Sequence, residues 1–285
     1  MKGMKKRGRL LLAEDISAIG SLSTTVALPL LVLQGITPAL LPTSILSTQS
    51  EGYGQPISLP VAQWVPRVLQ HWNQQKLKID GALIGYIGDL QVGKRLVTFL
   101  TKNKLPFVFI DPVFADGGKL YPNLAATQLE IMCQLIQQAH IITPNYTEAL
   151  LLTAGRIESE GDQQQAFSEC ELLERLEKMM QHHGRAVITG VEQAGKIGCI
   201  WRDENGCVRR SMFPRLHGHF YGSGDVFAAL LTAFLWKGRP FSESVSEATL
   251  LTYQALKDTA DANIERRAGI DISGIMRELA QKNTD

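Results

Sequence analysis

A short glycine-rich turn, Gly222-Ser223-Gly224-Asp225, runs directly into an apolar stretch that ends at Trp236. The apolar stretch contains no Pro or Gly and is predicted to form a helix, whose first N–H groups lack internal partners and carry partial positive charge. Because glycine lets a ligand approach the backbone closely, such a turn can bind an anion such as a phosphate group. The sequence therefore indicates a phosphate site at the start of this helix.

Asp225 is the unusual residue in that site, because phosphate groups would repel a carboxylate placed beside them. The residue makes chemical sense as a base that takes a proton from a hydroxyl group while the N–H groups hold a transferring phosphoryl group. The simpler interpretation is a glycine-rich loop in which Asp225 is an ordinary residue at the N-terminus of a helix. The four residues alone leave both interpretations open.

The composition is typical of a globular protein with a large core. Of the 285 residues, 45% are hydrophobic and 20% are charged, and this length allows one large domain or two smaller ones. The formal net charge of +1 gives no indication of a nucleic-acid or membrane-surface partner. The basic run at 2–9 is predicted to be a flexible tail, since the apolar run at 10–13 is too short for a signal peptide. No run approaches the ~18 apolar residues of a membrane span.

The cysteines give no sign of a metal site. They show no Cys-x-x-Cys spacing and no neighbouring histidine cluster, which argues against zinc. We expect Cys133, Cys170, Cys199 and Cys207 to be free, buried thiols of a cytoplasmic protein.

Short apolar runs alternate with longer helical patterns along most of the chain. The runs predicted as strands are 10–13, 82–84, 107–110, 140–142 and 186–189. The patterns predicted as helices are 23–33, 61–73, 92–100, 127–139, 146–152, 167–182, 243–257 and 271–281. Strands that are apolar throughout and separated by helices indicate a parallel sheet covered on both faces. We therefore predict one α/β domain over residues 1–285, with a tail at 1–9.

Two segments depart from this alternation. The segment 37–46 is predicted to be extended, and its two prolines favour an edge or irregular strand. Asn205-Gly206 lies between the alternating runs 197–201 and 207–213, which is a strong short-range signal for a β-hairpin. The sheet is thus expected to be mostly parallel.

Polar, acidic and hydroxyl residues follow the predicted strands. Ligands of parallel α/β sheets collect at the carboxyl ends of the strands, so these residues are expected to converge at one edge. The candidates are Asp15, Ser17, Tyr86, Asp111, Asp116, Thr143, Asn145, Glu148 and Thr189. Asp111, directly before Pro112, is interpreted as a structural group at a strand end. His217 and His219 precede the glycine-rich turn and are assigned no role.

Taken in order, these segments resemble the ribokinase-like vitamin kinases, specifically the bacterial pyridoxal and pyridoxamine kinases. The resemblance runs from about residue 11 to about residue 247 and depends on the joint order of its motifs, since each motif alone is weak. The motifs are Asp15-Ile16-Ser17, Thr25-Val26-Ala27-Leu28-Pro29, Leu41-Pro42-Thr43, Leu46-Ser47-Thr48, Gly85-Tyr86, Asp111-Pro112-Val113, Gly118-Lys119-Leu120-Tyr121, Ile142-Thr143-Pro144-Asn145, Glu148, Val187-Ile188-Thr189-Gly190 and Gly222-Ser223-Gly224-Asp225. The resemblance implies a three-layer ribokinase-like fold with a mostly parallel sheet, a homodimer, and ATP as phosphoryl donor.

By this resemblance, Asp225 is the base that activates the 5′-hydroxymethyl oxygen of a vitamin B6 compound. Gly222, Ser223 and Gly224 would then form the anion hole for the γ-phosphoryl group of ATP. Such a transfer asks little covalent chemistry of the protein, so positioning and charge neutralisation dominate.

The resemblance also assigns roles to the residues that follow the strands. Asp116 and Glu148 are implied as ligands of Mg²⁺, directly or through water, because hard oxygen ligands suit that ion. Thr143, Asn145 and Thr189 match the family's contacts to the nucleotide phosphates. The residues that fall where the family holds the pyridine ring are Asp15, Ser17, Ser50 and Tyr86.

The chain departs from the family pattern mainly in the substrate half, where Gln49-Ser50 stands in place of the common His-Thr and Glu14 in place of a frequent His. In the phosphate half, Ser223 replaces Thr but keeps a hydroxyl group. Ala115 replaces Gly, which would restrain its loop if that position needs a positive φ. These changes bear on the substrate more than on the reaction. The lead hypothesis is a kinase of pyridoxamine or pyridoxal. The alternatives are a kinase of hydroxymethylpyrimidine or another small alcohol, and a non-catalytic B6-binding protein.

Overall fold

An eight-stranded sheet forms the centre of the computed structural model, which describes residues 8–49, 52–121, 126–154, 167–181 and 183–282. The strand order is β13-β12-β11-β10-β7-β6-β1-β3. From β3 to β11 the neighbouring strands are parallel, whereas β12 is antiparallel to both of its neighbours. The bounds are β1 (Arg9–Ala13), β3 (Pro38–Leu40), β6 (Ile79–Ile84), β7 (Val108–Ile110), β10 (Ile141–Ile142), β11 (Arg185–Gln193), β12 (Lys196–Arg202) and β13 (Val208–Pro214).

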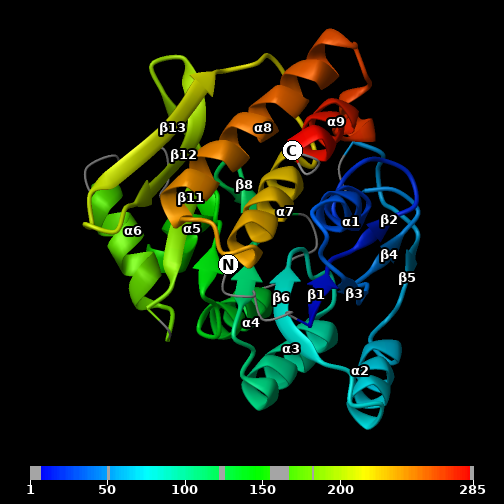
Figure 1. Ribbon diagram of the computed structural model, residues 1–285. Helices are drawn as coiled ribbons and strands as arrows, with labels where there is room; N and C mark the ends of the chain where they lie inside the picture. The colour runs from blue at the N-terminus through cyan, green and yellow to red at the C-terminus, as the bar shows by residue number, and fades with distance from the viewer. Residues whose placement is uncertain (1–7, 50–51, 122–125, 155–166, 182, 283–285) are drawn as a thin grey trace.

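Helices cover both faces of this sheet (Figure 1). One face packs against α1 (Thr24–Leu33), α7 (Ser223–Trp236), α8 (Phe241–Asp261) and α9 (Ser273–Lys282). The other packs against α2 (Trp64–Gln74), α3 (Leu90–Asn103), α4 (Ala126–Ile136), α5 (Tyr146–Ala154) and α6 (Glu169–Lys178). Successive strand residues alternate between the two cores, so Leu10 and Leu12 enter one and Leu11 the other. The predicted three-layer α/β architecture is confirmed.

The proline-containing segment 37–46 forms two separate strands. Its first part is β3, an edge strand of the large sheet, as the prolines predicted. Its end is β4 (Ile45–Leu46), which lies between β2 (Ile16–Ser17) and β5 (Ser58–Leu59) in a small second sheet. None of the three short strands of that second sheet was predicted as a separate element.

Several predicted boundaries shift by a few residues. Strand β1 begins at Arg9, inside the segment predicted as a tail, of which residues 1–7 lie outside the described residues. Helix α6 is shorter than the predicted 167–182, because Ser168 caps it in a capping box with Glu171. All four cysteines are free, as predicted, but Cys170 and Cys207 are exposed.

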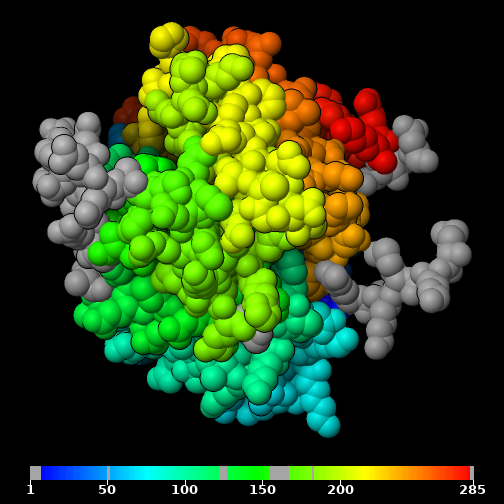
Figure 2. Space-filling view, turned by 90° about the vertical axis from the view of Figure 1, so that its left-hand side faces the viewer, coloured from blue at the N-terminus to red at the C-terminus, as the bar shows by residue number. Residues whose placement is uncertain are grey.

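The predicted hairpin around Asn205-Gly206 is confirmed as β12 and β13. A second turn, Ala194-Gly195, joins β11 to β12 and was not predicted, although both residues have the positive φ of a primed hairpin turn, at 49° and 73°. These strands, coloured yellow-green to yellow, form the surface beside α8 in Figure 2. The pairing of β11 with β12 is irregular between Ile188 and Val191, and this releases Thr189 from the regular ladder.

A small hairpin carries Asp116. Strands β8 (Ala115–Asp116) and β9 (Lys119–Leu120) are joined by two glycines with φ of 54° and 77°. Ala115 lies in the strand and is not among the residues with positive φ. The substitution of Ala for Gly therefore does not strain this loop.

Among the helices of the described residues, none has the length and apolar character that crossing a membrane requires.

Gly81 lets α7 lie close to the sheet. A Cβ atom at this position of β6 would stand 2.3 Å from Cζ3 of Trp236, at the end of α7. The Trp236 ring also packs edge-to-face on Phe107, with 5.6 Å between the ring centroids. The absence of a side chain at Gly81 thus sets the position of the helix whose other end carries Asp225.

We expect Gly81→Ala to lower the free energy of unfolding by roughly 1–3 kcal/mol, the usual cost of overpacking a core. Urea denaturation of the variant measures this cost. Trp236→Leu should lower stability in the parent but much less in the Gly81→Ala background, because the smaller side chain makes room for the new methyl group. Strict additivity of the two substitutions would contradict the contact that we infer.

Candidate active site

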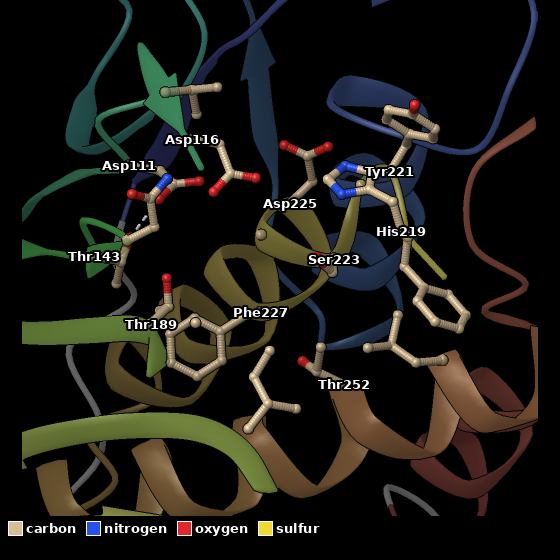
Figure 3. A pocket seen from close by; sticks show the side chains of 18 of the residues that line it. Asp111, Asp116, Thr143, Thr189, His219, Tyr221, Ser223, Asp225, Phe227 and Thr252 are labelled. Carbon is tan, nitrogen blue, oxygen red and sulfur yellow. Dashed lines mark hydrogen bonds between the residues drawn. The ribbon is translucent and has the colours of Figure 1, made fainter. Parts of the chain in front are cut away.

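A cavity of about 570 Å³ lies where the carboxyl ends of the parallel strands meet the N-terminus of α7 (Figure 3). Residues that follow β1, β6, β7 and β10 line it, so the predicted convergence at one sheet edge occurs. The predicted site residues that line the cavity are Asp15, Tyr86, Asp116, Thr143, Asn145, Glu148, Thr189, Gly222, Ser223, Gly224 and Asp225.

Two predicted substrate residues do not line the described cavity. Ser17 is buried, and its hydroxyl donates a hydrogen bond of 3.3 Å to Oδ2 of Asp15, so it reaches the cavity only through that carboxylate. Ser50 lies outside the described residues.

The N-terminus of α7 has the features of an anion site. Gly222 is its N-cap, with φ 89° and ψ 4°, and supplies no side chain to accept hydrogen bonds from the first turn. A Cβ atom on Gly222 would also lie 3.0 Å from Cβ of Leu22 and 3.1 Å from the carbonyl oxygen of Ser21. Glycine is therefore required for both conformation and space, and the first N–H groups of the helix remain available to an anion.

Asp225 lies in the first turn of α7 and points into the cavity (Figure 3). Its Oδ2 accepts a hydrogen bond of 2.6 Å from the backbone N–H of Ser23. Burial raises the pKa of Asp225 to about 7; the carboxylates of Asp111 and Asp15 add to this effect, and the hydrogen bond from Ser23 opposes it. At neutral pH the carboxyl group is thus divided between its acidic and basic forms.

Ser23 was not predicted as a site residue. It is buried and is the N-cap of α1, with φ 45° and ψ −131°, a conformation that non-glycine residues rarely adopt. The residue with this unusual backbone conformation is therefore the one whose N–H group donates to Asp225. Backbone strain concentrated at a cavity wall is typical of functional sites.

Asp111, interpreted from the sequence as a structural group at a strand end, also lines the cavity. It is buried and accepts a hydrogen bond of 2.6 Å from the hydroxyl of Thr143 (Figure 3, dashed line). Burial raises the pKa of Asp111 to about 6, against the effect of Thr143. Asp111 in turn raises the pKa of Asp225. The signal in the sequence was its position directly after a buried strand.

Glu14 is a fourth carboxyl group at this edge. It is buried, and its Oε2 has no hydrogen-bond partner. Burial raises its pKa well above the usual range, and the carboxylates of Asp225, Asp15 and Asp111 raise it further. Gly85 provides the space, because a Cβ atom there would lie 2.9 Å from Cγ of Glu14. A neutral, protonated Glu14 is the form that this environment favours.

Glu148 organises the loop beside the cavity. Its two oxygens accept hydrogen bonds from the backbone N–H groups of Phe114, Ala115 and Asn145, at 2.9–3.2 Å. Oδ1 of Asn145 accepts one from the N–H of Glu148, which completes a capping box at the start of α5. Burial raises the pKa of Glu148 well above the usual range, although these N–H groups oppose the shift.

The carboxylates present suit a magnesium ion that binds together with a nucleotide. Asp116 is exposed at the cavity, and Figure 3 shows its carboxylate directed toward the same space as those of Asp111 and Asp225. No cluster of three or more potential metal ligands from His, Cys, Asp and Glu occurs within the described ranges. Mg²⁺ usually takes only one or two carboxylates and completes its shell with water and phosphate oxygens. Asp116, with Glu148 behind it, fits that arrangement.

The other end of the cavity is apolar. Phe227 of α7, Ile197 of β12 and Leu256 of α8 contribute to its walls, and the rings of Phe213 and Tyr253 stack with 4.7 Å between centroids. Thr252, which also lines this part, is 9% exposed and its hydroxyl has no hydrogen-bond partner (Figure 3). A flat, partly polar group fits such a surface.

Comparisons with known proteins agree on one family. The family model described as phosphomethylpyrimidine kinase matches residues 34–269. The crystal structure of pyridoxal kinase from Lactobacillus plantarum is similar, with a TM-score of 0.90 and 36% sequence identity over 97% of this chain and 98% of that chain. The structure of a putative phosphomethylpyrimidine kinase from Bacteroides thetaiotaomicron with pyridoxal has a TM-score of 0.85 and 25% identity, and covers 96% of each chain.

Two of the curated relatives give shorter matches. A putative pyridoxal kinase from Schizosaccharomyces pombe is 31% identical over 172 residues, which is 58% of this chain and 53% of that protein. The match to a putative pyridoxal kinase from Caenorhabditis elegans covers 47% of that protein. The chain thus spans about half the length of these two curated relatives. The family model and the Lactobacillus structure each cover most of the chain, and both agree with the ribokinase-like resemblance of its motifs. The chain belongs to the phosphomethylpyrimidine kinase family.

Proposed function

We propose that this protein is an ATP-dependent kinase that phosphorylates the 5′-hydroxymethyl group of pyridoxal or pyridoxamine. The observation that carries the proposal is Asp225, a carboxyl group with a pKa of about 7 in the first turn of a helix whose N-terminus opens into the cavity. The similarity of the whole chain to the pyridoxal kinase from Lactobacillus plantarum, at 36% identity over 98% of that chain, supports pyridoxal and related compounds as substrates.

The proposed chemistry follows from this geometry. The substrate hydroxyl lies against Asp225, which takes its proton as the oxygen attacks the terminal phosphoryl group. A base with a pKa close to the working pH combines a useful ionised fraction with proton affinity. The N–H groups of Ser223 and Gly224 donate hydrogen bonds to the phosphoryl oxygens and so stabilise their negative charge. The helix already orients these N–H groups. The alcohol becomes a phosphate ester, and ADP leaves.

Asp116 and Glu148 would hold Mg²⁺, Asp116 by its exposed carboxylate and Glu148 through the loop that it organises. When bound, the ion would neutralise the charge of the nucleotide phosphates. Thr189 lies outside the β11–β12 ladder, forms an isolated bridge with Asn145 and lines the cavity as a candidate phosphate contact. The hydroxyl of Thr143 donates its one hydrogen to Asp111, so a contact with phosphate would require that hydroxyl to turn away from the carboxylate.

The substrate ring would bind on the side formed by the N-terminal half of the chain. Tyr86 and Asp15 line that wall, and Leu46 and Gln49 adjoin them. Burial raises the pKa of Tyr86, and the charge of Asp15 adds to it, so the phenol stays neutral and can donate a hydrogen bond. An aromatic ring beside a carboxylate suits a nitrogen heterocycle that carries polar substituents. The end lined by Phe227 and Thr252 would then accept the nucleotide base.

The first test is ADP release with a panel of alcohols in the presence of Mg²⁺ and ATP. Pyridoxal or pyridoxamine should stimulate release well above the rate without an acceptor. Stimulation by hydroxymethylpyrimidine alone would assign the enzyme to the pyrimidine branch of its family. Tight binding of a vitamer without any release would favour the non-catalytic alternative.

Asp225→Asn tests the proposed base. Asn is similar in size and is tolerated at a helix N-terminus, but it cannot accept the proton. Turnover should fall by ~10²–10⁴-fold, the usual contribution of a general base, while ATP affinity is retained or increases. The kcat/KM of the parent should rise with pH and level off above about 7, where Asp225 is ionised. Turnover within a few-fold of the parent would identify Asp225 as a helix residue only.

We also expect Asp225→Asn to be more stable than the parent at high pH. The pKa of Asp225 rises from an ordinary value of 3.8 to about 7 on folding, so the folded parent binds more protons than the unfolded chain between these values. Raising the pH through this window destabilises the parent but not Asp225→Asn. At pH 8 the variant should therefore melt at a higher temperature than the parent, and the difference should shrink as the pH falls toward 4. A difference that persists unchanged at pH 4 would point to another cause.

Asp116→Asn tests the proposed metal contact. The exposed carboxylate has few structural duties, so the variant should fold normally and need several-fold more Mg²⁺ for half-maximal activity. Glu192→Gln, which removes an acid elsewhere on the cavity wall, is the matched control and should leave this requirement unchanged. Glu148→Ala is a poor test, because it leaves three backbone N–H groups without their acceptor. An unaltered magnesium requirement in Asp116→Asn would remove that residue from the site.

A further inference from the structure

The cavity is rich in carboxyl groups and poor in cations. Its acidic lining residues are Asp15, Asp111, Asp116, Glu148, Glu192 and Asp225. Among the described residues that line it, only Arg215 and His219 have side chains that can carry a positive charge. A nucleotide triphosphate adds further negative charge to this space. The positions of these two side chains therefore decide where phosphate oxygens can find a cationic partner besides the metal.

Arg215 is already paired at the rim. Its Nε donates a hydrogen bond of 3.0 Å to Oε1 of Glu192, and both side chains are more than half exposed. This pair lies on the hairpin strands and their continuation. His219, in contrast, stands three residues before the N-cap of α7 and makes no hydrogen bond or ion pair with any described residue.

His219 is exposed, and two glycines and two ring contacts define the path of its segment. Gly218 and Gly222 enclose the segment with φ of 94° and 89°. The guanidinium of Arg266 lies 4.1 Å from the centroid of the Phe220 ring, which anchors the segment. The imidazole of His219 packs against Tyr221 at 4.4 Å between centroids, with 63° between the ring planes.

Figure 3 shows His219 and Tyr221 to one side of Asp225, and Asp111 and Asp116 to the other. The N-terminus of α7 follows His219 and Tyr221 directly in the chain and lines the same cavity. A phosphoryl group at that N-terminus would therefore have the carboxylates on one flank and the imidazole on the other. An N–H donor on the open flank complements the backbone donors of the helix.

We propose that His219 is a catalytic residue whose imidazole N–H contacts the terminal phosphoryl group of the nucleotide, on the flank opposite the carboxylates. The inference rests on the proposed kinase function and extends it to a residue outside the glycine-rich turn. His219 forms no covalent bond. The phosphoryl group passes from the nucleotide to the substrate oxygen, the proton of that oxygen goes to Asp225, and His219 supplies a hydrogen bond to a phosphoryl oxygen throughout.

The decisive measurement is nucleotide binding by calorimetry with Mg²⁺, using ADP and the imido analogue of ATP as probes. In His219→Ala, affinity for the imido analogue should fall on the order of tenfold, as expected for loss of one charge-assisted hydrogen bond, while ADP binds within about twofold of the parent. Unchanged affinity for both nucleotides would overturn the proposal. Equal weakening of both would also overturn it, by placing the contact elsewhere on the nucleotide.

Kinetics and a matched control complete the test. His219→Ala should lower kcat by roughly 10²-fold, with a smaller change in the KM of the acceptor, and His219→Gln should retain part of the activity because its amide still donates. His217 is exposed on the same segment but does not line the cavity, so His217→Gln should match the parent. An equal loss in His217→Gln would mean that the segment, and not the imidazole, is responsible. If the parent phosphorylates no alcohol, the proposed function fails, but the binding comparison still decides the role of His219.

Discussion

The site depends on burying like charges next to one another. Glu14, Asp15, Asp111 and Asp225 come from two strand ends and one helix, and three of them lose almost all contact with water. Such a group is stable only if its members are neutral or receive hydrogen bonds. Specific donors serve three of them: the Ser23 N–H for Asp225, the Thr143 hydroxyl for Asp111 and the Ser17 hydroxyl for Asp15. The pKa of Asp225 nevertheless stays raised, and the proposed role as a base requires that proton affinity.

Much of this arrangement could be predicted because it follows from strong local patterns. Apolar runs of strand length separated by helices specify the parallel sheet, and the sheet in turn brings together whatever polar residues follow each strand. Asp15, Asp116 and Thr189 were therefore placed at one edge without any distance being known, and they line one cavity. The role of Gly222 could also be predicted, because the residue before this apolar helix has a positive φ, which glycine adopts most easily.

Other features leave no mark in residue types. The donor to Asp225 is a backbone N–H, which nearly every residue possesses, so nothing distinguished Ser23 in the sequence. Glu148 was predicted as a metal ligand from its type and position, whereas its hydrogen bonds show that it also caps α5 and holds the turn at Ala115. His219 looked like one of two histidines near a turn. In the structure, His219 packs against Tyr221 and lines the cavity, whereas His217 does not line it.

The order of the chain has a consequence for biosynthesis. All six parallel strands are complete once residue 193 has been made, but the face of the sheet that includes Leu83 and Phe109 is covered largely by α7 and α8, which come later. A growing chain thus carries an exposed apolar sheet face until residues 223–261 have left the ribosome. This face of the sheet therefore cannot be buried before α7 and α8 are available, and until then chaperones would have an apolar surface to bind.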